Sequence, residues 1–384
     1  MEDIMKKFFP ILFVITLLFS GCFQPDKKED LPMQTTPATP PLQNAGVPVD
    51  MQQDMTAVSL PVITEETTDT DGNILFTYQA QDMRLVIPDP DVGKKILQDF
   101  SNKQTLFREA AEKVKVTAFS NTNESPLFFK ALFSPSRVDM NVLSLCGTTT
   151  SWSGGIHPVY SCIFANYSMV SGDVLTLGSI LTHADLADDL GELLIDAIRS
   201  IQDTQGIWND FEPAIRDRFS GNISDDQAWY FSNTGLCFSF PPYEIAPYSS
   251  GIITVTIPYS DLVGIIDDAY FPTEQTATTG DLLIQSLDSA DLTQFDQIAE
   301  IIAEEGGHMV LLYSDSTINH VTIEQNHSHT IFATATLSPG DAIMLEADLA
   351  DHILVVHYTS EGQSHSRYIQ VAESTVRLLE DIPE

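Results

Sequence analysis

Residues 138–167 read VDMNVLSLCGTTTSWSGGIHPVYSCIFANY, and this stretch decides how the centre of the chain folds. Two segments rich in apolar and β-branched residues, Val138–Thr149 and Val159–Tyr167, flank a polar connection that contains glycine. This pattern predicts two antiparallel strands joined as a β-hairpin. We therefore expect an antiparallel sheet at the centre of the fold.

The position of the hairpin tip decides what two of the four cysteines can do. With the tip near Gly154, Cys146 and Cys162 are equally far from it and lie directly opposite each other. Directly opposed strand residues have Cβ atoms about 4.5–5.5 Å apart, which a disulfide can bridge after modest adjustment. Outside the cytoplasm such a bond persists. The sequence leaves two alternatives, a Cys146–Cys162 disulfide or two buried free thiols. Cys237 is expected in the core.

The segments before this hairpin predict a second hairpin and a long helix. Pro61–Tyr78 alternates apolar and polar residues and is broken at Asp71-Gly72, a strong turn signal. Asp91–Lys113 carries apolar residues at helical spacing among charges, which predicts one or two amphipathic helices on the sheet. Lys115–Phe119 is expected to form a further strand.

The segments after the hairpin predict a second α+β part. A turn at Gly172-Asp173 precedes an apolar helical face between Leu186 and Ile198. Three short strands are then expected at Trp229–Phe231, Leu236–Phe240 and Ile252–Pro258.

The last hundred residues predict a small all-β domain. Short alternating segments separated by turn residues are typical of a β-sandwich. A helical segment is expected first, at Leu292–Glu305. The expected strands are Met309–Ser314, His320–Glu324, Thr330–Leu337, Ala342–Ala347, His352–Thr359 and Arg367–Val371.

A series of short motifs connects the two α+β parts to a known family. In order they are Gly154-Gly155-Ile156-His157-Pro158, Asn166-Tyr167, Ser171-Gly172-Asp173-Val174-Leu175-Thr176-Leu177, Trp229-Tyr230-Phe231, Pro242-Tyr243-Glu244-Ile245-Ala246-Pro247-Tyr248 and Thr256-Ile257-Pro258-Tyr259-Ser260. This order resembles the extracellular module of the anti-sigma factor RsiV, which also stands before the catalytic domain of the peptidoglycan deacetylase PdaC. The resemblance covers about Leu60–Pro272 and implies a small α+β domain joined to a second one.

The resemblance implies recognition of a ligand at the cell surface. The RsiV module binds lysozyme, so this module is expected to recognise either lysozyme or wall glycan. We expect no sigma regulation by the RsiV route, because no sigma-binding segment precedes Phe8 and no lasting transmembrane helix follows. We also expect no deacetylation, because the metal motif of that domain is missing.

The candidate ligand-binding residues are in one loop and one turn. Prolines in the loop can hold aromatic anchors and a carboxylate rigidly, and the Gly154–Pro158 turn is expected nearby. The candidates are Pro241, Pro242, Tyr243, Glu244, Tyr248 and His157. The alternative is that this loop is a crossover that fills the core, and Trp229 and Tyr230 are expected in the core.

The first residues predict a lipoprotein signal. Lys6 and Lys7 precede an apolar run, Phe8–Phe19, of about 12 residues, whereas about 20 are needed to span a bilayer. Ser20-Gly21 then leads to Cys22, whose thiol is expected to carry a diacylglyceryl group and anchor the protein on the outer face of the cell membrane. The alternative is an ordinary secretory signal with Cys22 there by chance.

Composition excludes one class of partner and favours another. The chain has 18 Lys and Arg against 54 Asp and Glu, a formal net charge of −36. Without a basic face, nucleic acid is not an expected partner. An acidic surface attracts cationic partners, although it also serves simple solubility.

Enzymatic motifs are missing from the sequence. There is no Gly-x-Ser-x-Gly elbow, no phosphate-binding Gly-Lys loop and no His-Glu-x-x-His. His157 lies near Ser151 and Ser153 but is expected to be a turn histidine that bonds to backbone. His327 and His329 could share a strand face as two metal ligands, yet a hairpin tip is the favoured interpretation. We expect no catalytic residues, no metal and no cofactor.

Together these observations predict an α+β protein of five segments. They are a signal peptide at 1–21, a disordered Pro/Thr/Gln-rich spacer at 22–59, α+β parts at 60–170 and 171–272, and a β-sandwich at 278–384. The expected function is non-catalytic binding or sensing in the cell envelope. The alternative is an enzyme that modifies wall glycan with carboxylates in an interdomain cleft, and a structural role in a wall complex is also open.

Overall fold

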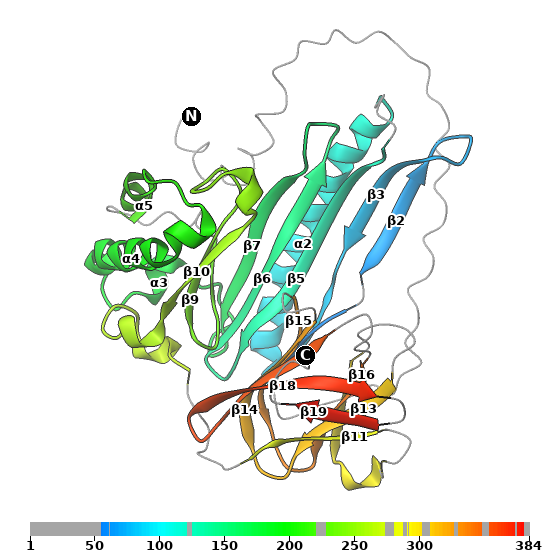
Figure 1. The fold of residues 1–384 in the computed structure, drawn as a ribbon, viewed down its shortest axis with the longest axis vertical. Helices are drawn as coiled ribbons and strands as arrows, with labels where there is room; N and C mark the ends of the chain where they lie inside the picture. The colour runs from blue at the N-terminus through cyan, green and yellow to red at the C-terminus, as the bar shows by residue number, and fades with distance from the viewer. Residues whose placement is uncertain are drawn as a thin grey trace. The chain divides into compact units, whose positions relative to one another are not determined.

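The computed structural model describes most of the chain after the first 54 residues (Figure 1). The described ranges are 55–60, 62–120, 125–219, 228–272, 280–286, 290, 292–301, 308–325, 329–347, 353–372 and 375–379. The predicted signal peptide, Cys22 and the spacer up to Asp54 lie outside them, as does His327. Within these ranges, no helix is both long and apolar enough to cross a membrane.

A five-stranded sheet forms the first α+β part. Its order is β2-β3-β5-β6-β7, with the β3–β5 pair parallel and the other pairs antiparallel. The strands are β2 Ile63–Thr68, β3 Ile74–Ala80, β5 Leu127–Val138, β6 Val142–Trp152 and β7 Val159–Ser168. The predicted hairpin around Asp71-Gly72 is confirmed as β2–β3.

One long helix, α2 (Pro90–Ala118), covers one face of this sheet (Figure 1). It begins sharply because the Asp89 carboxylate accepts hydrogen bonds from two backbone N–H groups of the first turn and proline occupies the first helical position. Val92, Ile96 and Phe100 repeat at helical spacing and are buried against the sheet. The predicted amphipathic helix is therefore confirmed.

The helix continues through residues for which a strand was predicted. The prediction at Lys115–Phe119 is wrong, because α2 ends only at Ala118. Ala111 and Ala118 are buried in the cluster that joins the helix to β3 and β5. This packing outweighs the β propensity of Val116 and Thr117 in the segment.

The central hairpin has a different register from the one predicted. In β6 and β7, Thr148 lies opposite Cys162 and Cys146 lies opposite Phe164, which centres the hairpin on Gly155 and not Gly154. The predicted register, which placed Cys146 opposite Cys162, is therefore wrong by two residues. Both are free thiols in the structure.

The second α+β part packs helices on a three-stranded sheet of order β10-β9-β8. Its core holds Trp229, as predicted, together with the apolar face of α4. The elements are α3 Leu177–Ile180, α4 Ala187–Gln205, α5 Glu212–Phe219, β8 Trp229–Phe231, β9 Gly235–Phe240, a short 3-10 helix η3 at Tyr248–Ser250, and β10 Ile253–Pro258. The predicted helix and three strands are confirmed.

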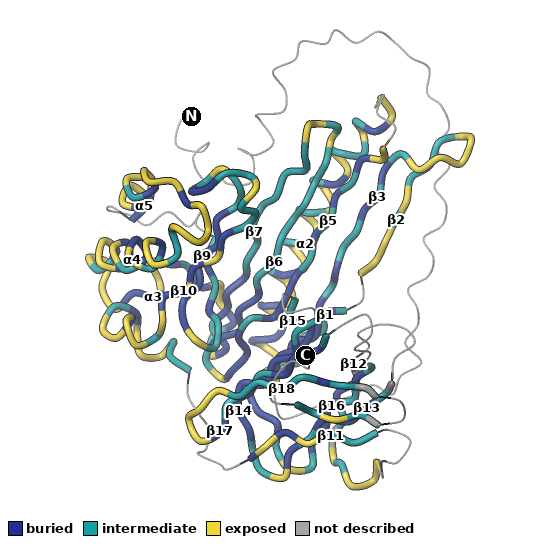
Figure 2. The backbone as a smooth tube through the Cα atoms, viewed as in Figure 1, coloured by how far each residue is buried: buried dark blue, intermediate teal, exposed yellow. Residues whose placement is uncertain are grey.

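The C-terminal region is a β-sandwich, as predicted. A four-stranded sheet of order β11-β13-β16-β12 and a seven-stranded sheet of order β19-β18-β17-β14-β15-β1-β4 share one apolar core. Its strands after residue 280 are β11 Leu282–Ser286, β12 Gln297–Ile301, β13 His308–Ser314, β14 Ile318–Gln325, β15 His329–Leu337, β16 Asp341–Ala347, β17 Leu354–Ser360, β18 Gln363–Ala372 and β19 Thr375–Leu379. Figure 2 shows the buried residues concentrated along the inner strands of the sheets.

Two predicted features of this region are wrong. The segment predicted as a helix, Leu292–Glu305, contains a 3-10 turn at Leu292–Gln294 and then β12, which pairs in parallel with β16. Ala299 and Ile301 alternate into the sandwich core, which a strand allows. The expected boundary at residue 278 also fails, because the seven-stranded sheet includes β1 (Thr56–Ser59) and β4 (Met83–Val86).

The strand β1 corrects the extent of the predicted disordered spacer. Thr56–Ser59 is buried and pairs with β15 on one side and β4 on the other. The Ser59 hydroxyl donates to the carbonyl oxygens of Phe133 and Thr330. The start of the described chain thus binds the α+β sheet and the sandwich together.

Candidate binding surface

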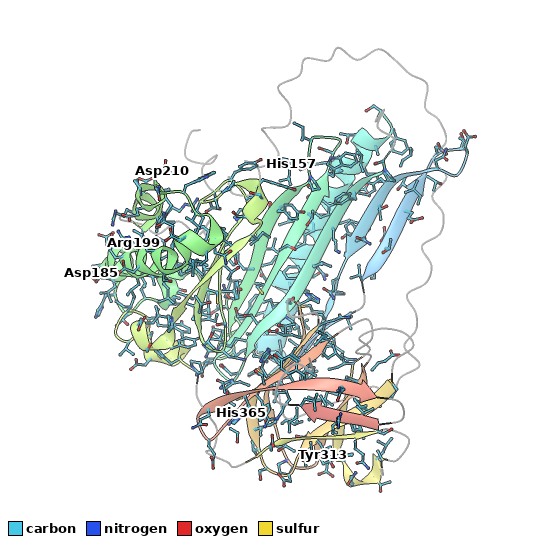
Figure 3. The ribbon with its side chains drawn as sticks, viewed as in Figure 1. His157, Asp185, Arg199, Asp210, Tyr313 and His365 are labelled. Carbon is cyan, nitrogen blue, oxygen red and sulfur yellow. The ribbon has the colours of Figure 1, made fainter. Side chains whose placement is uncertain are left out.

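Two loops build the candidate site. The β6–β7 hairpin ends in a turn in which Gly154 has φ +94° and the Trp152 indole N–H donates to the Gly155 carbonyl oxygen at 2.8 Å. The second loop follows β9 and contains Tyr243, whose backbone takes the left-handed φ of 71°. A backbone bond of 2.9 Å from Tyr243 N to Ala246 O closes this loop. Figure 3 labels His157 at the end of the hairpin.

Four aromatic rings from the two loops and β7 meet at this place. The rings of His157 and Tyr248 stack with centroids 3.9 Å apart and an interplanar angle of 26°. The Tyr243 ring lies 5.9 Å from each of them, and Tyr160 lies 5.8 Å from Tyr248. We call His157, Tyr160, Tyr243, Tyr248 and the adjacent Ile156 the aromatic surface.

Hydrogen bonds fix the orientation of these rings. His157 Nδ1 lies 3.1 Å from the Pro158 carbonyl oxygen, which can only accept, so Nδ1 carries the proton. In the neutral ring Nε2 is then an acceptor, and the Tyr243 hydroxyl donates to it at 3.2 Å. The Tyr248 hydroxyl also donates to the Pro158 oxygen at 3.1 Å. The predicted backbone bond of His157 is confirmed.

Glu244 differs from the exposed carboxylate that was expected. It forms an ion pair with Arg218 of α5 and is largely buried. Burial raises the pKa of its carboxyl above the usual range, although the Arg218 charge opposes this shift. Glu244 therefore holds the loop to α5 and presents little free charge to a ligand.

The other candidate residues have smaller roles. Pro241 and Pro242 are half-buried at the start of the loop. Burial raises the pKa of both the Cys146 and the Cys162 thiol to about 12, so neither is a ready nucleophile. Cys22, the expected lipidation site, lies outside the described residues.

Sequence reasoning missed three contributors to the site. Ile156 is fully exposed at the hairpin turn, and Tyr160 and Arg218 come from β7 and α5. Tyr160 could have been found from strand alternation, since it shares a face with Cys162 two residues later. Arg218 could not, because its partner Glu244 is 26 residues away along the chain.

The two histidine-based arrangements that the sequence suggested are not formed among the described residues. The bonds of His157 go to Tyr243 and Pro158, and none goes to Ser151 or Ser153. No three His, Cys, Asp or Glu in the described part of the chain are grouped as a metal site requires. His329, one of the two histidines considered as ligands, shares a 2.7 Å hydrogen bond with Ser134.

The fold and this geometry define an α+β module that presents aromatic side chains on two loops beside a β-sandwich. Residues 180–260 match the model of a family described as "Protein of unknown function (DUF3298)". The match includes the Tyr243–Tyr248 half of the aromatic surface and leaves out the His157 half. The comparison with curated proteins gives no match.

Two solved structures of DUF3298 proteins are similar to the chain. One, from Bacteroides fragilis NCTC 9343, is 16% identical, covers 56% of this chain and 94% of its own, and has a TM-score of 0.39. The other, from Pseudomonas aeruginosa PAO1, is 17% identical, covers 56% of this chain and 98% of its own, and has a TM-score of 0.37.

Proposed function

We propose that this protein is an envelope lipoprotein whose α+β module binds a cationic protein, with lysozyme as the first candidate. A lipid on Cys22 holds it on the outer face of the membrane, and binding involves no catalysis. The motif order shared with the RsiV module supports lysozyme as the ligand. The structural observation that carries the proposal is the aromatic surface.

The aromatic surface has the composition of a protein-binding hot spot. Ile156 is fully exposed, and the Tyr243 side chain is 57% exposed on a strained loop. Exposed aliphatic and tyrosine side chains contribute most to binding when a partner covers them, because water then leaves both surfaces. The ring stack and the bonds to Pro158 fix the two loops before binding, which lowers the entropy cost of association.

Charge supports a cationic protein over wall glycan. With three acidic residues for each basic one, the chain attracts a basic partner and speeds its encounter. Peptidoglycan carries free carboxylates on its peptide stems and would be repelled by the same field.

Retention on two ligands tests this function. The full chain is passed over immobilised animal lysozyme and over insoluble peptidoglycan at about 20 mM and about 300 mM salt, conditions that differ several-fold in screening length. We expect retention by lysozyme that weakens at raised salt, and little retention by peptidoglycan. Retention by peptidoglycan alone would point to glycan recognition, and turnover of wall fragments would point to the rival enzyme.

A further inference from the structure

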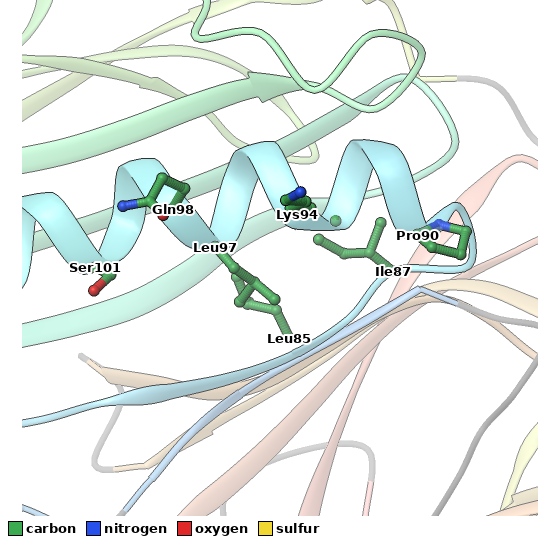
Figure 4. A pocket seen from close by; sticks show the side chains of 8 residues that line it. Leu85, Ile87, Pro90, Lys94, Leu97, Gln98 and Ser101 are labelled. Carbon is green, nitrogen blue, oxygen red and sulfur yellow. The ribbon is translucent and has the colours of Figure 1, made fainter.

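A second candidate site lies between helix α2 and strand β4. There a pocket of about 520 Å³ opens between the two elements (Figure 4). It shares no residue with the aromatic surface. Its lining consists of Leu85, Ile87, Pro90, Gly93, Lys94, Leu97, Gln98 and Ser101. This volume is within the usual range of ligand sites, about 300–1,000 Å³.

One wall of the pocket belongs to an edge strand. β4 is the last strand of the seven-stranded sheet and pairs with β1 on its other side. Among the described residues, no strand pairs with β4 on the side away from β1. A strand with one free edge can accept an extended peptide through main-chain hydrogen bonds.

Apolar side chains from both walls line the middle of the pocket. Leu97 projects from α2 toward Leu85 in Figure 4, and its side chain is 47% exposed. Gly93 contributes no side chain, and a Cβ atom there would lie 3.4 Å from the Ile87 side chain, so the helix passes close to Ile87 at this end of the pocket. An apolar strip of this kind accepts the alternate side chains of an extended peptide.

Lys94 gives the pocket a positive charge. Nearby cations have carboxylate partners: Lys95 pairs with Asp173 at 3.1 Å, Lys103 with Asp99 at 3.7 Å. Among the ion pairs of the described residues, none includes Lys94. A lysine without a carboxylate partner beside an apolar pocket is able to attract an anionic group from outside.

We propose that this groove binds the C-terminal end of an extended, apolar peptide, which adds as a strand to β4 and places its terminal carboxylate at Lys94. The length agrees with this occupant. The lining residues of α2 run from Pro90 to Ser101, about 16 Å along the helix, which matches about five extended residues.

The probe is a fluorescent pool of hexapeptides in which Val, Leu or Ile alternate with Ser or Thr. One pool has a free C-terminal carboxylate and a second has a C-terminal amide. A third pool is N-methylated at every second residue, which removes strand hydrogen bonds while it keeps the side chains. Fluorescence polarisation measures the binding of each pool to the full chain.

We expect the free-acid pool to bind about three-fold to ten-fold more tightly than the amide pool, and the N-methylated pool to bind least. The variant Lys94→Gln should remove the difference between acid and amide, while Lys113→Gln on the same helix should keep it. Leu97→Ser should weaken both pools several-fold. Its matched control is Leu106→Ser, because Leu106 is 45% exposed on the same helix and outside the pocket.

Four results would overturn the proposal. The first is no binding of any pool, and the second is equal binding of acid and amide pools to the unchanged protein. The third is that dodecanoate binds, that this binding depends on Lys94, and that no peptide pool binds. The groove would then be a lipid site. The fourth is that the chain self-associates, that Leu97→Ser abolishes this association, and that the peptides do not affect it. The groove would then be an interface between two copies of the chain.

Discussion

At the scale of single residues, the strained backbone of Tyr243 holds the aromatic surface in place. Its φ of 71° is rare for a residue with a Cβ atom. The ring and hydroxyl gain contacts with His157 and Tyr248 that compensate for this strain. Strain of this kind is typically found at functional positions.

This conformation predicts an unusual order of stability for two truncations. Tyr243→Gly and Tyr243→Ala both lose the ring, but glycine takes positive φ freely. We expect the glycine variant to be more stable than the alanine variant by about 1 kcal/mol. Urea unfolding of both variants measures this difference. Greater stability of the alanine variant would show that the residue is not left-handed.

Cys146 and Cys162 give a second residue-scale prediction. With the pKa of Cys146 and Cys162 raised to about 12 by burial, almost no thiolate forms at pH 8. We expect iodoacetamide to label both cysteines slowly in the folded protein and quickly in urea without reductant, with mass spectrometry as the readout. Cysteines that stay unlabelled in urea until reductant is added would instead reveal a disulfide.

The individual candidate residues were predictable in part. Proline and aromatic residues in Pro241–Tyr248 indicated a rigid loop, and the structure brings Tyr243 and Tyr248 to His157. The stack itself was not predictable, because it joins residues about 90 positions apart. The cysteine register failed since a hairpin shifts by two residues when its centre moves by one.

At the scale of elements, close approach between β5 and β6 depends on one glycine. A Cβ atom at Gly147 would lie 2.0 Å from the Leu132 carbonyl oxygen, closer than any real contact. A β-carbon at Gly178 would meet no atom within 4 Å. The two glycines therefore form a matched pair for testing the sheet.

We expect Gly147→Ala to destabilise the protein by about 1–3 kcal/mol, because the strands must separate. Gly178→Ala, in α3, should be neutral or slightly stabilising, since alanine favours the helix. The change in free energy of unfolding in urea measures both effects. Similar stability of the two variants would contradict the described β5–β6 pairing.

The elements with a regular pattern were predicted and those that depend on tertiary partners were not. The apolar spacing of Val92, Ile96 and Phe100 was sufficient to find α2. The strand β12 looked helical because its sequence alone does not reveal its parallel partner β16. Propensity was overridden there by burial in the sandwich core.

At the scale of the whole molecule, the α+β sheet and the sandwich meet where β5 packs beside β15. His329 lies at this place, with Nδ1 sharing a hydrogen bond of 2.7 Å with the Ser134 hydroxyl. Burial, and then the charge of Lys130, lowers the pKa of His329 below its usual 6.5. The folded protein therefore favours the neutral ring.

This junction predicts a loss of stability on acidification. Because the folded-state pKa is lower than the unfolded one, the unfolded chain binds more protons below pH 6.5. The contribution is present above pH 6.5 and falls as the pH drops toward the folded-state pKa. We expect His329→Gln to flatten the dependence of unfolding free energy on pH between about 6.5 and 5. An unchanged slope would show that His329 does not sense pH.

The domain boundaries were the least predictable feature at this scale. The alternating strands after residue 308 indicated a sandwich, and the structure confirms it. Its seven-stranded sheet also takes β1 and β4 from the start of the chain. The pairing of Thr56 with Thr334 joins strands that are far apart in the chain and leaves no local pattern in the sequence. The sequence therefore could not show that β1 and β4 belong to the sandwich.

The central claim is that the aromatic surface binds a cationic protein, and one titration tests it most directly. Calorimetry measures the affinity of animal lysozyme for the full chain, for Ile156→Ser and for Val170→Ser, an exposed valine in the turn after β7. We predict that Ile156→Ser weakens binding by about ten-fold or more and that Val170→Ser leaves it within about two-fold. Equal affinity of the two variants, or no binding by the unchanged chain, would contradict the account.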